Sequence, residues 1–448
     1  MKKLITTLTN IWKIEELRNR IITTLLLLLI YRIGCHVVLP GVNPDALAAG
    51  KSTEGNSIVD LINMFAGGSF SRSAIFALGV MPYISASIVV QLLGIAVPAF
   101  QKMQKEGESG RKKMTQITRY LTLAITLVQA VAYVKTQVPA EAKTIAEPMF
   151  TILSAIVLTA GTLFVMWLGE KITDKGIGNG ISLIIMVGII AQLPAGLVAE
   201  WGSRMSPSGG GPIPLLLEFL ALFFVVIFSI LVVQGIRKVP VQYAKKIVGN
   251  KQVGGVRQYI PLKVNAAGVM PIIFAQAIMF LPMALSQFFP NLQSEFLTSL
   301  SNYTSLAYNV TFGVLIIAFT FFYTAIMVNP QQMSEDMKKN GGFIPGIKPG
   351  YDTNLFIDNV ISRITFPGAI FIAIIAILPA IASKFGVNNQ FAHFYGGTSL
   401  LILVGVVLDT LQQIESHLLM RHYDGLMKTG RVKGRSTASV EGIDQSVI

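Results

Sequence analysis

The sequence predicts an all-α polytopic membrane protein with ten transmembrane helices. Of its 448 residues 52% are hydrophobic and only 13% are charged, whereas charged residues make up about 25% of a typical soluble domain. The mean hydropathy is +0.61. Ten apolar runs are long enough to cross a bilayer, which takes about 20 residues per helix.

The predicted spans form two groups of five. They cover residues 21–39, 74–97, 120–138, 149–169, 181–199, 213–236, 265–289, 307–328, 364–383 and 396–415. An outer connecting loop, 200–212, separates an N-terminal half (21–199) from a C-terminal half (213–415), and a tail (416–448) follows. The basic amphipathic segment 1–20 lacks a following small-residue cleavage site, so we interpret it as a retained lead into the first span and not as a signal peptide.

The distribution of Lys and Arg predicts that both termini are cytoplasmic. With the N-terminus inside, the inner segments hold 29 of the 36 Lys and Arg residues. These segments are 1–20, 98–119, 170–180, 237–264, 329–363 and 416–448. Cytoplasmic loops retain positive charge during membrane insertion, which favours this orientation over its inverse.

A short apolar segment, 58–66, lies on the outer side before the second span. It is too short to cross a bilayer, and Gly67 and Gly68 follow it. A half-length helix at membrane depth must be buried in protein or line a watery cavity. The residues alone leave two interpretations open, a re-entrant packing helix and a functional element.

The sequence contains no pattern typical of an enzyme. The stretch "GKST" at 50–53 resembles the end of a phosphate-binding loop, but Asp45 stands where that motif needs glycine. Other catalytic motifs do not appear. The single cysteine, Cys35, and four scattered histidines lack metal-ligand spacing, so we expect neither a metal nor a cofactor.

A secondary transporter with inverted halves is the main alternative, because broken helices and two similar halves are typical of that class. Ion-coupled transporters usually place ionisable groups near the middle of the membrane. Here Arg32 is the one charged residue deep within a predicted span, and no carboxylate lies at that depth. This counts against ion coupling.

Nine segments, in order, carry a resemblance to a known family. They are "NMFAGGSFSRSAIFALGVMPYISASIVVQLL", "KEGESGRKK", "TRYLTL", "MWLGEKITDKGIGNGIS", "YAKK", "PLKVNAAGVMPIIFAQ", "FFYTAIMVNP", "GGFIPGIKPG" and "FYGGTSLLILVGVVLD". On these segments the chain resembles the SecY family of protein-conducting channels. The resemblance implies two pseudo-symmetric five-helix halves around an hourglass pore in the bacterial inner membrane. It also implies that unfolded secretory polypeptides cross through the pore and that transmembrane segments leave sideways into lipid.

The resemblance places an apolar ring at the neck of the pore. Its members are Val80, Ile84, Ile181, Ile185, Ile273 and Ile402. Val80 and Ile84 are four residues apart, as are Ile181 and Ile185, so each pair shares a helix face. On spacing alone such residues are more often lipid or helix contacts. Bulky aliphatic side chains at a narrow neck would exclude water and ions without selecting any polypeptide sequence.

The resemblance also implies a plug and a lateral gate. The plug is 58–66, and it would rest against the ring through Ile58, Leu61, Ile62, Met64 and Phe65, with Gly67 and Gly68 as its flexible connection. The gate lies between spans two and three on one side and seven and eight on the other. Gln91, Asn265 and Gln276 fall there by position. Their alternative role is ordinary interhelical hydrogen bonding.

The inner loops predict a docking surface. Loop 237–264 carries seven Lys or Arg and no Asp or Glu, which suits phosphate-rich RNA or an acidic protein, although membrane topology alone also favours positive charge here. The residues expected to bind are Arg237, Lys238, Lys245, Lys246, Lys251 and Arg257. In loop 329–363, "GGFIPGIKPG" predicts a rigid turn that presents Lys348, where the family often has arginine.

The resemblance implies the following partners: the ribosome with its rRNA, the SecA ATPase, small SecE-type and SecG-type membrane subunits, signal peptides and nascent polypeptides, and membrane lipids. The chain itself shows no chemistry that would supply energy, so SecA or the ribosome is expected to drive transport.

Overall fold

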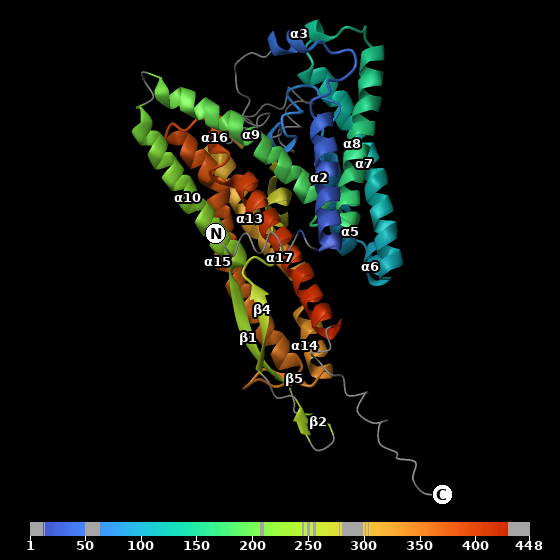
Figure 1. Ribbon diagram of the computed structural model, residues 1–448, viewed down its shortest axis with the longest axis vertical. Coiled ribbons are helices and arrows are strands. Elements are labelled where there is room, and N and C mark those ends of the chain that lie inside the picture. The colour runs from blue at the N-terminus through green and yellow to red at the C-terminus, as the bar shows by residue number, and fades with distance from the viewer. Residues whose placement is uncertain are drawn as a thin grey trace, which may run out of the picture.

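The structure is a computed structural model. It describes residues 12, 14–49, 63–206, 210–243, 246–248, 251–253, 257–276, 278–279, 299–300, 302 and 304–428. Within these ranges a bundle of long helices carries a β-hairpin at one end and the short helix α3 at the other (Figure 1). The two large predicted inner loops, 237–264 and 329–363, therefore lie together at the end opposite α3.

Helices supply most of the fold. In the first half they are α2 (Glu15–Gly34), α3 (Pro44–Ala49), α5 (Met81–Ala96), α6 (Pro98–Lys105), α7 (Glu108–Gln137), the 3-10 helix η1 (Ala140–Ala142), α8 (Met149–Lys175) and α9 (Gly180–Met205). In the second half they are α10 (Pro212–Gln234), α13 (Leu306–Met327), α14 (Pro330–Lys339), α15 (Tyr351–Lys384), α16 (Asn389–Ala392) and α17 (Gly397–Lys428).

The predicted count of ten spans is not confirmed. Among the described residues seven helices are long and apolar enough to cross a membrane, and α5 with α6, bent by 100°, makes up to eight. Helix α2 falls outside this set because five of its 20 residues are charged, namely Glu15, Glu16, Arg18, Arg20 and Arg32. Much of the predicted seventh span, 265–289, lies outside the described residues.

Several helix ends differ from the predicted spans. The second span, predicted from residue 74, becomes helical only at Met81, because residues 66–80 form successive turns interrupted by an isolated β-bridge from Ala74 to Val38. Ser73 and Gly79 have positive φ there, which an α-helix cannot contain. Helices α7 and α15 instead begin about a dozen residues before the predicted spans. Hydropathy alone cannot detect such polar extensions.

The two halves meet along α9. This helix packs against α8 in its own half and against α10, α16 and α17 in the other. An apolar core that draws on both halves lies at this junction. Small residues permit close helix packing in this region: a Cβ on Gly180 would lie 2.0 Å from the carbonyl oxygen of Gly169.

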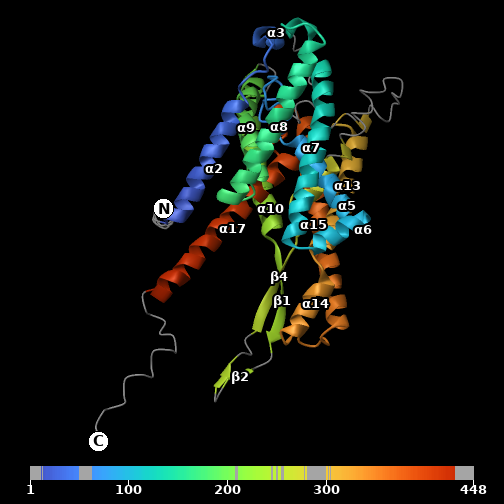
Figure 2. The same ribbon diagram turned by 90° about the vertical axis from the view of Figure 1, so that its right-hand side faces the viewer.

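The basic loop 237–264 forms a hairpin. Strands β1 (Ile236–Tyr243) and β4 (Arg257–Lys263) pair antiparallel, β5 (Gly342–Phe343) adds to the end of β1, and β2 (Lys246–Val248) pairs with β3 (Lys251–Val253). Val239 and Val241 pack against Met337 of α14 and Ile357 of α15. Figure 2 shows this hairpin and α14 beside one another below the helical bundle. A second small core thus fixes the hairpin to the rest of the chain.

Candidate functional site

All six residues of the predicted ring lie in one apolar cluster. Val80 precedes α5 and Ile84 follows in its first turn, Ile181 and Ile185 begin α9, Ile273 lies in the helical stretch 270–276, and Ile402 belongs to α17. Val80, Ile185 and Ile402 are at most 3% exposed, and the other three are half-buried. Residues more than 300 positions apart in the sequence therefore converge from both halves.

The described part of the predicted plug belongs to the same cluster. Met64 and Phe65 are buried in it, whereas Ile58, Leu61 and Ile62 lie outside the described residues. Residues 63–65 are helical, and the chain then turns at Gly67 and Gly68, whose φ angles are +63° and +87°. Only glycine adopts such angles freely, so both positions require it.

Polar contacts hold the turn that follows the plug residues. Arg32 of α2 donates from Nη1 to the carbonyl oxygen of Gly67 at 3.0 Å. The side-chain oxygen of Asn63 accepts a hydrogen bond from the backbone N–H of Ser71 at 3.0 Å. The hydroxyl of Tyr133 donates to the carbonyl oxygen of Phe70 at 2.6 Å. None of these three hydrogen bonds is predicted by the sequence. Arg32 is the one of the three side chains that has a sequence signal, because it is the one charge deep in a predicted span.

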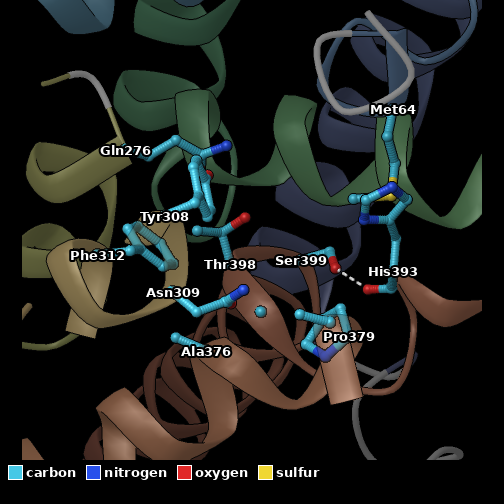
Figure 3. A pocket seen from close by; sticks show the side chains of 12 residues that line it. Met64, Gln276, Tyr308, Asn309, Phe312, Ala376, Pro379, His393, Thr398 and Ser399 are labelled. Atoms are coloured by element: carbon cyan, nitrogen blue, oxygen red, sulfur yellow. Dashed lines mark hydrogen bonds between the residues drawn. The ribbon is translucent and has the colours of Figure 1, made fainter. Parts of the chain in front are cut away.

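A small cavity that is lined by both polar and apolar side chains lies beside Met64 (Figure 3). Its volume is about 30 Å³, which is enough for one or two water molecules. Polar side chains on its wall are Gln276, Tyr308, Asn309, His393, Thr398 and Ser399. Ser399 donates to the carbonyl oxygen of His393 at 2.5 Å. Met64, a predicted plug residue, thus borders this cavity of the second half as well as the predicted ring.

The three predicted gate residues do not form one hydrogen-bonded group. Gln91 donates to the Ser87 hydroxyl at 3.2 Å, within its own helix α5. Asn265 is buried, and its side-chain oxygen accepts no hydrogen bond among the described residues. Gln276 is also buried and lines the cavity. Two of the three therefore place amide groups inside the protein, in the first half of the predicted seventh span.

The predicted docking residues lie on the hairpin and the adjoining turn. Arg237 and Lys238 on β1 are exposed. Lys246 is on β2, Lys251 on β3 and Arg257 at the start of β4, while Lys245 lies outside the described residues. Lys263, which the prediction left out, is exposed at the end of β4. No Asp or Glu occurs in this stretch of the sequence to neutralise these charges.

Lys348 is exposed on the turn between β5 and α15. The hydroxyl of Thr353 donates to the Lys348 carbonyl oxygen at 2.8 Å, and the hydroxyl of Ser334 on α14 donates to that of Gly350 at 2.6 Å. These bonds attach the end of the turn that precedes α15 to α15 itself and to α14. The ammonium group therefore projects from an ordered support, beside the hairpin.

Comparison with known proteins places these features in a family. A SecY family profile matches residues 74–411. The protein translocase subunit SecY of Halalkalibacterium halodurans is 43% identical over 431 residues, covering 94% of this chain and 99% of the relative. That of Chlamydia trachomatis is 40% identical over 455 residues, covering 96% and 99%.

Solved structures share the fold. A structure described as a protein conducting channel has a TM-score of 0.65 at 17% identity and covers 93% of this chain and 95% of that one. Canine Sec61 from a ribosome-channel complex has a TM-score of 0.57 at 16% identity, with the same coverage. The length of the match and the identity to the bacterial relatives leave one assignment: the chain belongs to the SecY family.

Proposed function

We propose that this chain is the channel subunit of a bacterial protein translocase. It passes unfolded secretory polypeptides across the membrane and releases transmembrane segments sideways into lipid. The observation that carries the proposal is the convergence of six aliphatic residues from both halves on the plug residues Met64 and Phe65. The relatives are translocase subunits, so the alternative of a small-solute transporter has no support from them.

The ring closes the pore by excluding water. Ions cannot shed their hydration shell at an aliphatic neck, because no side chain there replaces the lost water. A polypeptide can pass because aliphatic side chains change rotamer and make no directional bond with it. Each half contributes part of the ring. A small separation of the two halves, along the contacts of α9 with the second half, therefore widens the neck.

The plug seals the closed state. Met64 and Phe65 fill the space beside Val80 and Ile185, and the glycines after them allow the segment to leave without breaking a helix. The gate residues Asn265 and Gln276 lie in the first half of the predicted seventh span. The side-chain oxygen of Asn265 is buried without a hydrogen-bond donor among the described residues, which costs free energy in the closed state, so a hydrophobic signal helix can open this seam.

The hairpin and the Lys348 turn form the docking surface for the driving partner. Exposed cations at Arg237, Lys238 and Lys263 suit ribosomal RNA or an acidic face of SecA. Solved neighbours include a Sec61 channel and a yeast Ssh1 complex, both bound to ribosomes. SecE-type and SecG-type subunits complete the complex, and both termini lie in the cytoplasm with the hairpin.

Transport assays in vesicles test this function. The chain, reconstituted with its SecE-type and SecG-type subunits, should protect a signal-bearing precursor from protease when SecA and ATP are added. The same precursor without its signal should stay accessible to protease. Saturable uptake of a small solute, with no protected precursor, would instead establish the transporter.

A further inference from the structure

Arg32 is a cation in an apolar setting, and the part of the chain that the structure describes places no acidic partner beside it. It lies in the last turn of α2 and is half-buried. Among the described residues no carboxylate lies within ion-pair distance of its guanidinium group. Its one side-chain hydrogen bond there goes to the carbonyl oxygen of Gly67, at 3.0 Å. Charged side chains in membrane spans are costly and usually have a functional role.

Gly67, whose carbonyl oxygen accepts that bond, lies in a tightly packed place. Gly67 lies between Arg32 and α9: a Cβ added to Gly67 would lie 2.9 Å from Nη1 of Arg32 and 3.1 Å from Cα of Gly188. A Cβ added to Gly188 would lie 2.9 Å from the carbonyl oxygen of Phe65. The end of the plug thus packs between the guanidinium group of Arg32 on α2 and the backbone of Gly188 on α9.

We propose that Arg32 is a positioning residue that latches the plug shut. This inference rests on the proposed function, because it gives Arg32 a role only if 58–66 seals the pore. The guanidinium supplies a charge-assisted hydrogen bond to the Gly67 carbonyl, and such bonds are about twice as strong as neutral ones. When the plug leaves, both groups lose this partner and must be solvated, so the bond favours the closed state.

The latch explains the residue type and its position. A lysine is a point charge that would orient less well, whereas the planar guanidinium directs several N–H groups in a fixed geometry. The bond also ends on a backbone carbonyl, so it does not depend on any side chain of the plug. The competing interpretation is that Arg32 merely complements the C-terminal end of the α2 dipole.

An epistasis experiment separates these interpretations. Ion leak is measured in planar bilayers for Arg32→Met, for Arg32→Lys and for the matched control Arg72→Met, whose side chain is exposed on the turns that follow Gly68. Each variant is made both in the intact chain and in a chain that lacks 58–66. Loss of a hydrogen bond with a charged donor should raise the open fraction at least about tenfold.

The latch predicts that Arg32→Met raises leak only when the plug is present. Arg32→Lys should show a smaller rise, and Arg72→Met none. An equal rise with and without the plug would overturn the latch and support the helix-dipole interpretation, and no rise in the intact chain would also overturn it. Deletion of 58–66 tests the plug by itself. If the deletion causes no ion leak, the proposed plug is rejected. If the deletion causes leak but Arg32→Met does not, the latch alone is rejected. Translocation of a signal-bearing precursor by each variant shows that the channel has assembled.

Discussion

Gly188→Ala should weaken the closed state of the proposed channel by displacing the proposed plug. Gly188 lies in α9 directly behind Phe65, and the added Cβ would be 2.9 Å from its carbonyl oxygen. Ordinary contact begins at about 3.4 Å, so the plug backbone must retreat by about 0.5 Å. Overpacking of this kind costs about 1–3 kcal/mol. Because about 1.4 kcal/mol is a tenfold change in an equilibrium constant, the open fraction should rise between about fivefold and about a hundredfold.

Single-channel recording in planar bilayers measures that fraction directly. Gly202→Ala is the matched control, because it adds the same methyl group to the same helix but meets nothing within 4 Å. Both substitutions gain similar helix propensity, so the difference between them reports the contact with Phe65. Equal open fractions for Gly188→Ala, Gly202→Ala and the unaltered chain would refute the placement of the plug against α9.

Three further predictions concern other parts of the protein. Asn at Ile84 and Ile185 should raise ion leak and relax the need for a signal sequence. Asn at Ile190, an exposed position on α9, should do neither. Unchanged conductance of the Ile84 and Ile185 variants would count against the proposed ring. Glu at Lys245, Lys246 and Lys251 should weaken ribosome or SecA binding in a salt-dependent way, while Glu at Lys384 leaves it intact; normal binding with altered topology would show that these charges serve orientation alone. Arg204→Leu should lower the thermal unfolding temperature by several degrees in detergent, since it leaves Glu200 and Glu218 buried without their cation, a loss of about 3–5 kcal/mol. Arg119→Leu removes a more exposed pair with Glu170 and should cost about 1 kcal/mol or less; equal effects would contradict this difference.

The sequence predicts the positions of most long helices because hydropathy reports the thickness of the bilayer. It does not predict where α5 begins. The apolar residues from Ala74 to Val80 continue the hydropathy pattern, yet positive φ at Ser73 and Gly79 keeps the chain in turns until Met81. Such backbone angles depend on packing against neighbouring helices, and no window average reports them.

The candidate site was predictable only in part. Periodicity pairs Val80 with Ile84, but their convergence with Ile402 of α17 is a tertiary contact that spacing cannot reveal; the family resemblance supplied it. The hairpin was expected only as a charged loop. Arg237 has the same strand parity as the buried Val239 and Val241, so the sequence lacks the regular apolar and polar alternation that predicts a strand. The bond from Arg32 to Gly67 joins residues 35 positions apart through a backbone carbonyl, which has no side-chain signature.

The passage of a polypeptide through the ring is the central claim, and site-specific crosslinking tests it most directly. A photo-reactive residue is placed at Ile84, and for comparison at Val198, which is 73% exposed on the surface of α9. A ribosome-bound secretory chain is stalled partway through export. We predict strong adducts at Ile84 that require a signal sequence on the chain, and few at Val198. Equal labelling at both positions, or labelling at Ile84 that does not depend on the signal, would contradict a conduit at the ring.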